Sequence, residues 1–349
     1  QIRYPAAVRT ENGAVREQDP AYKIYQRYRY AYDTYGYLFL SENTGEDSQG
    51  RRDGEQSFQE GKGSLEQEEA LQEGEEKKDG FQEESLCPKE GEEAAQITLA
   101  QLQDYDFLMK HFYSVHASTT AGRDLMKADM LLGTGMKLEQ NPQVPQILIY
   151  HTHSQETYAD YGPENPEATI VSCGEYLAEL LRDRGWNVIH DTGTYDIQGG
   201  KLDRNRAYNY ALDGITGILQ ENPEIQVILD LHRDGVKEGT RLISQVNGKE
   251  TAKIMFFHGM SRTPEGEIAY LPNPYLKENL AFAFQMQFAA EGLYPGYTRK
   301  IYLKGLRYNL HLRGRSALIE VGAQTNTLQE AMNAMEPLAD LLDRVLQGN

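Results

Sequence analysis

The chain has 349 residues and a formal net charge of −18 at pH 7, which allows one large domain or two ordinary ones. It has two cysteines, Cys87 and Cys173, so a disulfide framework, a CxxC redox motif and a cysteine-ligated zinc site are all excluded. The sequence has no apolar run of about eighteen residues and no signal-peptide pattern at its start. Because it begins at Gln1 rather than Met, we expect that any leader or anchor was removed.

The acidity is concentrated in residues 41–95, which hold 18 Asp and Glu against 6 Lys and Arg. This segment is rich in Glu, Gln and Gly and has few large apolar residues, so burial cannot offset the entropy of ordering it. We therefore predict a disordered acidic linker there, which also argues against a nucleic-acid or anionic-membrane partner. Residues 1–40, which are rich in tyrosine over 20–40, are interpreted as a membrane-proximal segment.

Residues 96–143 are predicted to form a helical lead-in or cap. Leu99, Leu102, Tyr105 (or Asp106), Leu108 and Met109 recur at spacings of three and four behind Thr98, and the pattern continues into HFYSVHASTTAG.

From residue 144 onward, short apolar runs alternate with longer amphipathic stretches, which predicts a catalytic domain over 144–349. This alternation is typical of an α/β fold with an open, mostly parallel sheet and helices on both faces. Gly185 is expected to stop the first helix of this domain, and Asn326 is expected to cap the last. The predicted strands lie at 144–150, 186–191, 225–232, 252–259 and 316–322, and the predicted helices at 168–184, 203–221, 275–293 and 327–347.

Three predicted strands end in groups that suit metal binding or proton transfer. The first runs into His151, His153 and Glu156, the third carries His232, and the last carries Glu320. Ligands in such sheets bind beyond the carboxyl ends of the strands, so we expect these side chains to meet at one edge.

A catalytic zinc site needs three ligands from His, Asp or Glu and keeps one position open. His153 and Glu156, in an HxxE spacing, supply two ligands from one turn, and His232 supplies the third. Glu320 then remains as the carboxylate that takes a proton from water and passes it to the leaving nitrogen. Partial burial there should raise the pKa of Glu320 toward a useful range.

Alternatives exist for several of these residues. Glu156 could equally cap the following turn, and Glu167 is the rival third ligand. Strand alternation predicts that His151 points the same way as His153, so His151 could be the ligand, could orient a ligand or could donate to the transition state; we assign it a supporting role. Arg233 could bind a substrate carboxylate or only pair with Asp234 as a salt bridge.

Several motifs together resemble the stage II sporulation protein P family. They are LIYHTHSQETY, GEYLAELLRDRGWNVIHDTGTYD, ILDLHRDG, GLYPGYTRKIY, YNLHL and ALIEVGAQTNTLQEA, in this order over residues 145–345. The resemblance implies a zinc-dependent N-acetylmuramoyl-L-alanine amidase with a phosphorylase/hydrolase-like α/β fold. It also implies cleavage of peptide cross-links during septal thinning and engulfment in sporulation.

The resemblance places the histidines of the wider amidase group at His153 and His232 and its catalytic glutamate at Glu320. That group's second ligand would fall near Glu167, whereas HxxE, as in zinc carboxypeptidases, favours Glu156, the residue we choose. The family's usual Asn-Gln-Asp is replaced here by Asn309-Leu310-His311, so that His311 could contribute something new.

Family members are anchored in the mother-cell membrane and act outside the cytoplasm. The resemblance implies peptidoglycan as substrate, and the transglycosylase sporulation protein D and the membrane protein M as partners. His151 and Arg233 are expected to stabilise the oxyanion or hold stem-peptide carboxylates. The rival functions are a zinc carboxypeptidase or endopeptidase acting on stem peptides, and a non-catalytic wall-binding scaffold.

Overall fold

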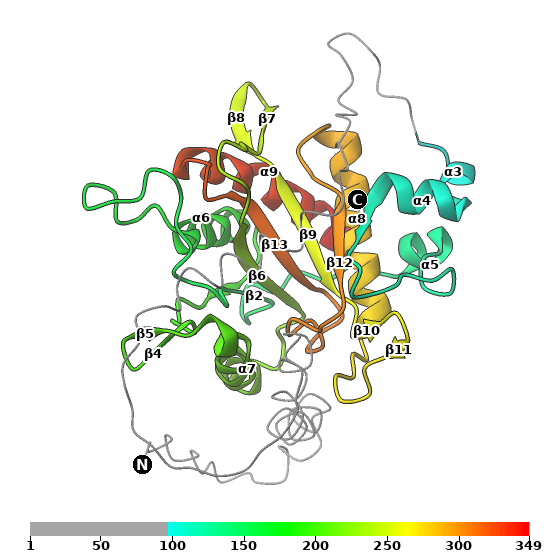
Figure 1. Ribbon diagram of the computed structural model, residues 1–349, viewed down its shortest axis with the longest axis horizontal. Coiled ribbons are helices and arrows are strands. Elements are labelled where there is room, and N and C mark those ends of the chain that lie inside the picture. Colours follow the sequence, from blue (N-terminus) through cyan, green and yellow to red (C-terminus); the bar gives the residue numbers. More distant parts are fainter. Residues whose placement is uncertain (1–96, 349) are drawn as a thin grey trace, which may run out of the picture.

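The computed structural model describes residues 97–348, so the interpretations of residues 1–40 and 41–95 fall outside the described residues. A seven-stranded sheet forms its centre, with the strand order β1-β12-β9-β13-β6-β2-β3 (Figure 1). The strands of this sheet are β1 (Tyr113–Val115), β2 (Ile147–Tyr150), β3 (Val188–His190), β6 (Val227–Asp234), β9 (Ile254–Gly259), β12 (Ile301–Lys304) and β13 (Ser316–Ala323).

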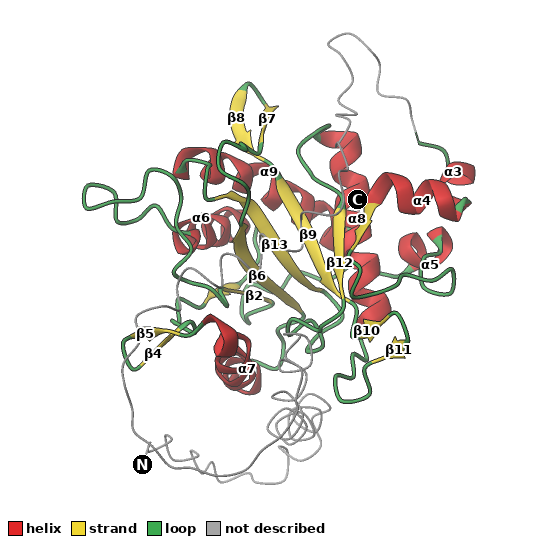
Figure 2. Ribbon diagram, viewed as in Figure 1, coloured by secondary structure: helices red, strands yellow, loops and turns green. Residues whose placement is uncertain are grey.

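The pairing within the sheet is parallel except between β9 and β13, which run antiparallel. The prediction of a mostly parallel α/β sheet is therefore confirmed. The described residues also form three separate two-stranded antiparallel sheets (Figure 2). They are β4 (Ile197–Gln198) with β5 (Lys201–Leu202), β7 (Ile243–Val246) with β8 (Lys249–Ala252), and β10 (Arg262–Thr263) with β11 (Gly266–Glu267).

The helices of the described residues are α3 (Leu99–Gln103), α4 (Tyr105–Phe112), α5 (Ala128–Gly133), α6 (Ile170–Asp183), α7 (Arg204–Glu221), α8 (Leu276–Leu293) and α9 (Leu328–Gln347). Within residues 97–348, none of them combines the length and apolar character needed to cross a membrane. Helix α6 ends just before Gly185, whose φ of 92° is a conformation that glycine adopts without strain.

Two expectations about helix ends are wrong. The pattern behind Thr98 breaks at Asp104, which caps α4, and α4 ends at Phe112, where the chain becomes strand β1 instead of continuing as a helix. The cap of α9 is Thr327, one residue beyond Asn326, because its side chain and that of Glu330 form a reciprocal capping box.

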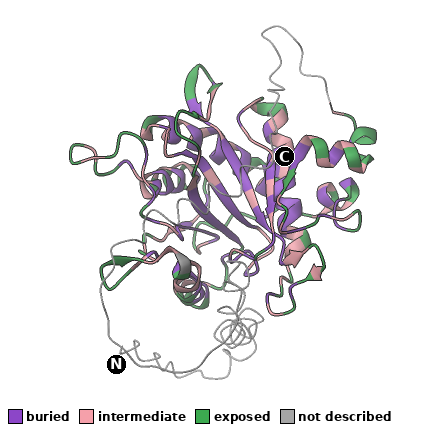
Figure 3. Cartoon of the chain, viewed as in Figure 1, coloured by how far each residue is buried: buried purple, intermediate pink, exposed green. Residues whose placement is uncertain are grey.

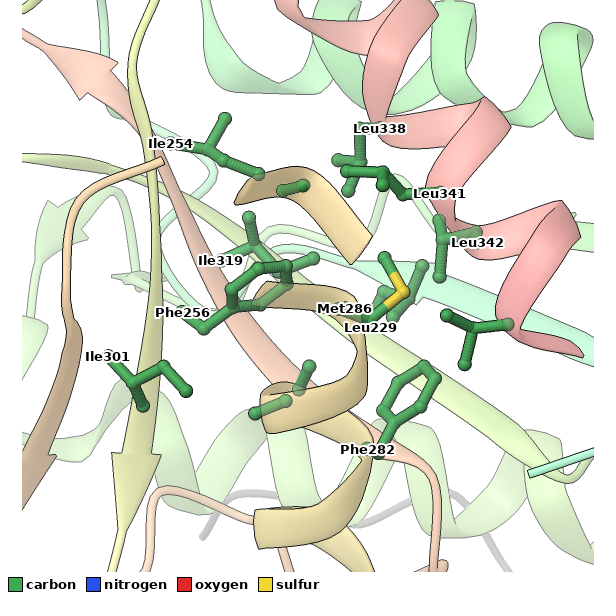
Figure 4. Close-up of a cluster of buried hydrophobic side chains, with 14 of the residues drawn as sticks. Leu229, Ile254, Phe256, Phe282, Met286, Ile301, Ile319, Leu338, Leu341 and Leu342 are labelled. Carbon is green, nitrogen blue, oxygen red and sulfur yellow. The ribbon is translucent and has the colours of Figure 1, made fainter. Parts of the chain in front are cut away.

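The larger hydrophobic cluster lies on the side of the sheet covered by α6, α8 and α9, and a smaller one lies on the side of α7. In the larger cluster, Phe256, Ile301 and Ile319 from the sheet meet Met286 from α8 and Leu342 from α9 (Figure 4). In the smaller cluster, α7 packs on Leu148, Tyr150 and Ile228 from β2 and β6. Successive residues of a strand therefore face different helices, which fixes the face of the functional side chains that lie within strands, His232 and Glu320.

Asn279→Ala is expected to lower the free energy of unfolding by about 3 kcal/mol, because it leaves two buried main-chain groups unpaired. The fully buried Asn279 donates to Leu310 O at 2.6 Å and accepts from Ser316 N at 2.8 Å, which joins α8 to β13 and to the loop before it. Urea unfolding measures the loss. Asn333→Ala is the matched control, because Asn333 bonds Glu250 O at the surface; equal losses in the two variants would contradict this role.

Candidate active site

The site lies where β2 and β6 end, beside the middle of β13. After Tyr150 the chain leaves β2 and turns, and Asp230 of β6 holds this turn in place. Its carboxylate accepts from Thr152 N at 2.9 Å and from Thr152 Oγ1 at 2.6 Å. The turn presents His153 and Glu156 to His232 of β6, and Glu320 of β13 lies directly beside His232 in the sheet register.

His232 is buried between two carboxylates. Its Nε2 lies 2.9 Å from Asp230 Oδ1, and its Nδ1 lies 3.6 Å from Glu156 Oε2. Burial opposes the charged imidazolium, but the negative charges of Asp230, Glu156 and Glu320 outweigh it and raise the pKa of His232 to about 10. These neighbouring carboxylates therefore favour the protonated form of His232.

His153 has its ring edge-on to that of His232, with ring centres 5.3 Å apart. Burial lowers the pKa of His153 to about 3, so its ring is neutral. Its Nδ1 is inaccessible to solvent and has no hydrogen-bond partner, and the nearest carboxylate, that of Asp196, is 4.0 Å away. A neutral imidazole with an unpaired nitrogen is the form that binds a metal ion.

Glu156 is buried, whereas its rival Glu167 is exposed. One oxygen of Glu156 accepts from Arg233 N at 2.9 Å, and the other lies 3.5 Å from Arg204 Nη2. Burial raises the pKa of Glu156 despite these positive neighbours. Of the two glutamates left open by the sequence, Glu156 is the one that contacts His232.

The donor set of His153, Glu156 and His232 fits a catalytic zinc ion in chemical type. The 3.6 Å between Glu156 Oε2 and His232 Nδ1 is close to the roughly 3.3 Å that separates two ligands of a tetrahedral zinc ion. The unpaired Nδ1 of His153 is a further donor beside this pair. Across residues 97–348, however, no group of three His, Cys, Asp or Glu side chains is arranged so that it could hold a metal ion. The ligand assignment thus stays a prediction.

Glu320 shares the site face of the sheet with His232, its neighbour across β6 and β13. Its Oε2 is inaccessible to solvent and has no hydrogen-bond partner. Burial raises the pKa of Glu320 to about 8, with Asp234 and Glu156 adding to the rise and His232 opposing it. A carboxyl group with such a pKa can both take and return a proton near neutral pH.

The expectation that His151 points the same way as His153 is wrong. His151 is fully buried on the side of α6, where its Nδ1 donates to Leu231 O at 3.0 Å and its Nε2 lies 2.9 Å from Nε2 of His190. Alternation ends with the strand at Tyr150, and the turn then carries His153 to the side of α7. His151 thus ties the end of β2 to β6 and has no nitrogen left for the site. A side chain on Gly174 of α6 would collide with its ring.

Arg233 is held by main-chain oxygens. Its Nε donates to Thr157 O at 2.9 Å and its Nη1 to Asp234 O at 3.3 Å. The carboxylate of Asp234 pairs with Arg299, so the alternative of a salt bridge between Arg233 and Asp234 is not what the structure shows. A role of Arg233 toward an oxyanion or a substrate carboxylate stays a prediction.

His311 lies in the loop before β13 and is buried. Burial, with Arg307 adding to it, lowers the pKa of His311 well below its ordinary value, so its ring is neutral.

Two site residues were not found from the sequence. Asp230 shares the face of His232 by alternation along β6, a signal that the LDLH motif carries and that could have been used. Tyr208 of α7 stacks on the ring of His232, at 6.3 Å and 13°, and meets His153 edge-on at 5.6 Å. No local pattern in α7 marks Tyr208, because only the packing of α7 over β6 brings it there.

Comparison with solved structures finds distant likenesses. The CwlD amidase from Clostridioides difficile, in complex with the GerS lipoprotein, is 14% identical, with a TM-score of 0.38 over 58% of this chain and 97% of that chain. The N-acetylmuramoyl-L-alanine amidase AmiC2 of Nostoc punctiforme is 13% identical, with a TM-score of 0.36 over 60% of this chain and 98% of that chain. Likenesses this distant do not decide function.

Sequence comparison is more specific. Stage II sporulation protein P of Bacillus subtilis (strain 168) is 25% identical over 217 residues, which are 57% of this chain and 50% of that protein. The chain thus spans about half the length of this curated relative. The family model for stage II sporulation protein P matches residues 31–343. Since this match covers most of the sequence, the chain belongs to the stage II sporulation protein P family.

Proposed function

We propose that this chain is a zinc-dependent peptidoglycan hydrolase acting in sporulation. The bond that it cleaves is the amide between N-acetylmuramic acid and the L-Ala of the stem peptide, and peptide cross-links are a second target. The cleavage takes place during septal thinning and engulfment. The observation that carries the proposal is the pairing of Glu156 with His232 beside neutral His153, with Glu320 next to His232 in the sheet. Membership of the family supports the substrate class.

His153, Glu156 and His232 would hold the zinc ion. When bound, zinc supplies a Lewis acid beside the scissile amide. Glu320 takes a proton from the attacking water and gives it to the amide nitrogen as the carbon–nitrogen bond breaks. Asp230 positions the ring of His232 through the contact at Nε2, which leaves Nδ1 directed at Glu156. The ring of Tyr208 lies nearly parallel to that of His232 and forms an aromatic wall on this side of the site.

The contacts of Arg233 favour an amidase over a carboxypeptidase. A carboxypeptidase needs a cation that reads a free C-terminal carboxylate. Arg233 is the candidate for that task in the sequence, and its Nε and Nη1 are engaged by main-chain oxygens. We further propose, from family membership alone, a membrane-tethered location outside the mother-cell cytoplasm and partnership with sporulation proteins D and M.

Digestion of purified peptidoglycan by the zinc-loaded full chain is expected to release free stem peptides and glycan without peptides. Mass spectrometry of the products identifies both directly. The same digestion in the presence of a zinc chelator is the control and should release neither. Products in which every stem peptide remains on the glycan while cross-links are cut would overturn the amidase assignment in favour of an endopeptidase.

A further inference from the structure

On the face that α8 and α9 do not cover, strands β9 and β12 carry the aromatic side chains of Phe257 and Tyr302, with Lys304 at the end of β12. On the covered face, Phe256 and Ile301 are fully buried in the large cluster. On the other face, Phe257 and Tyr302 are intermediate in burial, the class that is coloured pink in Figure 3. A sheet face open to water normally carries polar side chains, so partly exposed aromatic rings there indicate a binding surface.

These two residues belong to a line that crosses the sheet and ends at the site. In the strand register Tyr302 pairs with Phe257, Phe257 with Leu318, and Leu318 with Asp230. Asp230 is the carboxylate that contacts His232. The aromatic side chains and the candidate active site therefore lie on the same face of the sheet, and the two residues between them in this register, Leu318 and Asp230, are buried.

Four rings continue this line above the strands, and we call them the aromatic row: Tyr302, Phe257, Tyr308 and Tyr208. Ring centres are 5.5 Å apart between Tyr302 and Phe257, 4.7 Å between Phe257 and Tyr308, and 5.3 Å between Tyr308 and Tyr208. Tyr208 then stacks on His232. All four residues of the aromatic row are intermediate in burial.

The middle of the aromatic row is held by strained backbone. Tyr308 and Asn309 have φ angles of 50° and 55°, which non-glycine residues adopt at a cost. Asn309 Nδ2 donates to Tyr208 O at 2.7 Å and thereby fixes this loop to α7. Two successive strained residues beside an active site are typical of a segment kept for binding rather than for stability.

We propose that the aromatic row binds the sugar chain of the substrate, which rests on the function proposed above. Pyranose rings have apolar faces of C–H groups that pack on aromatic rings, while their hydroxyls stay in water. The aromatic row itself carries no charged side chain. This suits an intact glycan, whose lactyl carboxyls are tied up as amides, better than a stem peptide with free carboxylates. The muramic acid to be cleaved would then lie at the His232 end, with further sugars extending toward Tyr302.

Binding of a neutral β-1,4-linked N-acetylglucosamine oligosaccharide to the full chain tests this proposal without turnover. Tyr302→Ala, at the far end of the aromatic row, should weaken binding roughly tenfold, the upper range for loss of one ring contact. Tyr302→Trp should restore it, because the ring rather than the hydroxyl makes the contact. Tyr176→Ala is the control, since Tyr176 is a partly exposed tyrosine of α6, on the other side of the sheet.

The outcomes separate the two proposals. Absence of hydrolysis with oligosaccharide binding that depends on Tyr302 would overturn the proposed function and keep the aromatic row as a glycan site. Hydrolysis combined with equal affinity of wild type and Tyr302→Ala would overturn the aromatic row alone. A wild-type chain that binds free stem peptides but no oligosaccharide would also overturn the assignment of the aromatic row as a glycan site. Thermal unfolding of each variant shows that it is folded, and Tyr302→Leu, which keeps an apolar side chain but removes the ring, replaces the alanine variant if that variant is not folded.

Discussion

Glu320→Gln should lower kcat on peptidoglycan by roughly a thousandfold while the zinc content stays that of the unmodified chain. The substitution removes the group that exchanges the proton and leaves His153, Glu156 and His232 in place. Turnover is measured from the release of stem peptides, and zinc by elemental analysis of the same preparation. Glu167→Gln makes the same chemical change at an exposed position and should have no effect.

The fold should tolerate Glu320→Gln. Burial raises the pKa of Glu320 in the folded chain to about 8, above its value in the unfolded chain. The charged form is therefore disfavoured by folding, and between the unfolded pKa and about pH 8 this carboxyl increasingly destabilises the fold as the pH rises. A neutral glutamine avoids this cost, so its free energy of unfolding at pH 7 should equal or exceed that of the unmodified chain. Full activity in this variant would assign proton transfer to another group.

His232→Ala is expected to abolish zinc binding, because it removes the ligand that lies between Asp230 and Glu156. It should also cost about 3 kcal/mol of stability, since buried Asp230 loses its positive partner. His153→Ala separates the two effects. The low pKa of His153 keeps its ring neutral. Removal of this side chain should therefore abolish zinc binding without leaving a buried charge unpaired.

Equilibrium dialysis against zinc, followed by elemental analysis, measures both variants. Glu156→Ala should also lose the metal, whereas Glu167→Ala should keep it, because Glu167 is exposed and Glu156 contacts His232. Near-normal zinc in His153→Ala and His232→Ala would refute the ligand set. If Glu167→Ala lost zinc and Glu156→Ala kept it, Glu167 rather than Glu156 would be the third zinc ligand.

The sequence by itself determined the order of most elements after residue 144 and two of the groups at the site. Apolar runs of strand length and amphipathic stretches of helix length are local signals, so β2, β6, β9 and β13 lie where they were predicted. His232 and Glu320 lie within strands, where alternation fixes the face of each side chain. Their meeting at one place therefore followed from the expectation of neighbouring parallel strands.

The tertiary structure alone decided the rest. The antiparallel course of β9 beside β13 depends on pairing between distant segments, which no local pattern encodes. The turn after Tyr150 ends the alternation, so His151 faces α6 while His153 faces α7. The HxxE spacing favoured Glu156 over Glu167 in the sequence, but only the tertiary structure shows that Glu156 is buried and contacts His232 while Glu167 is exposed. The physical reason is the same in each case: periodicity reports which residues share a face within an element, whereas burial and charge pairing are set by what packs against that face.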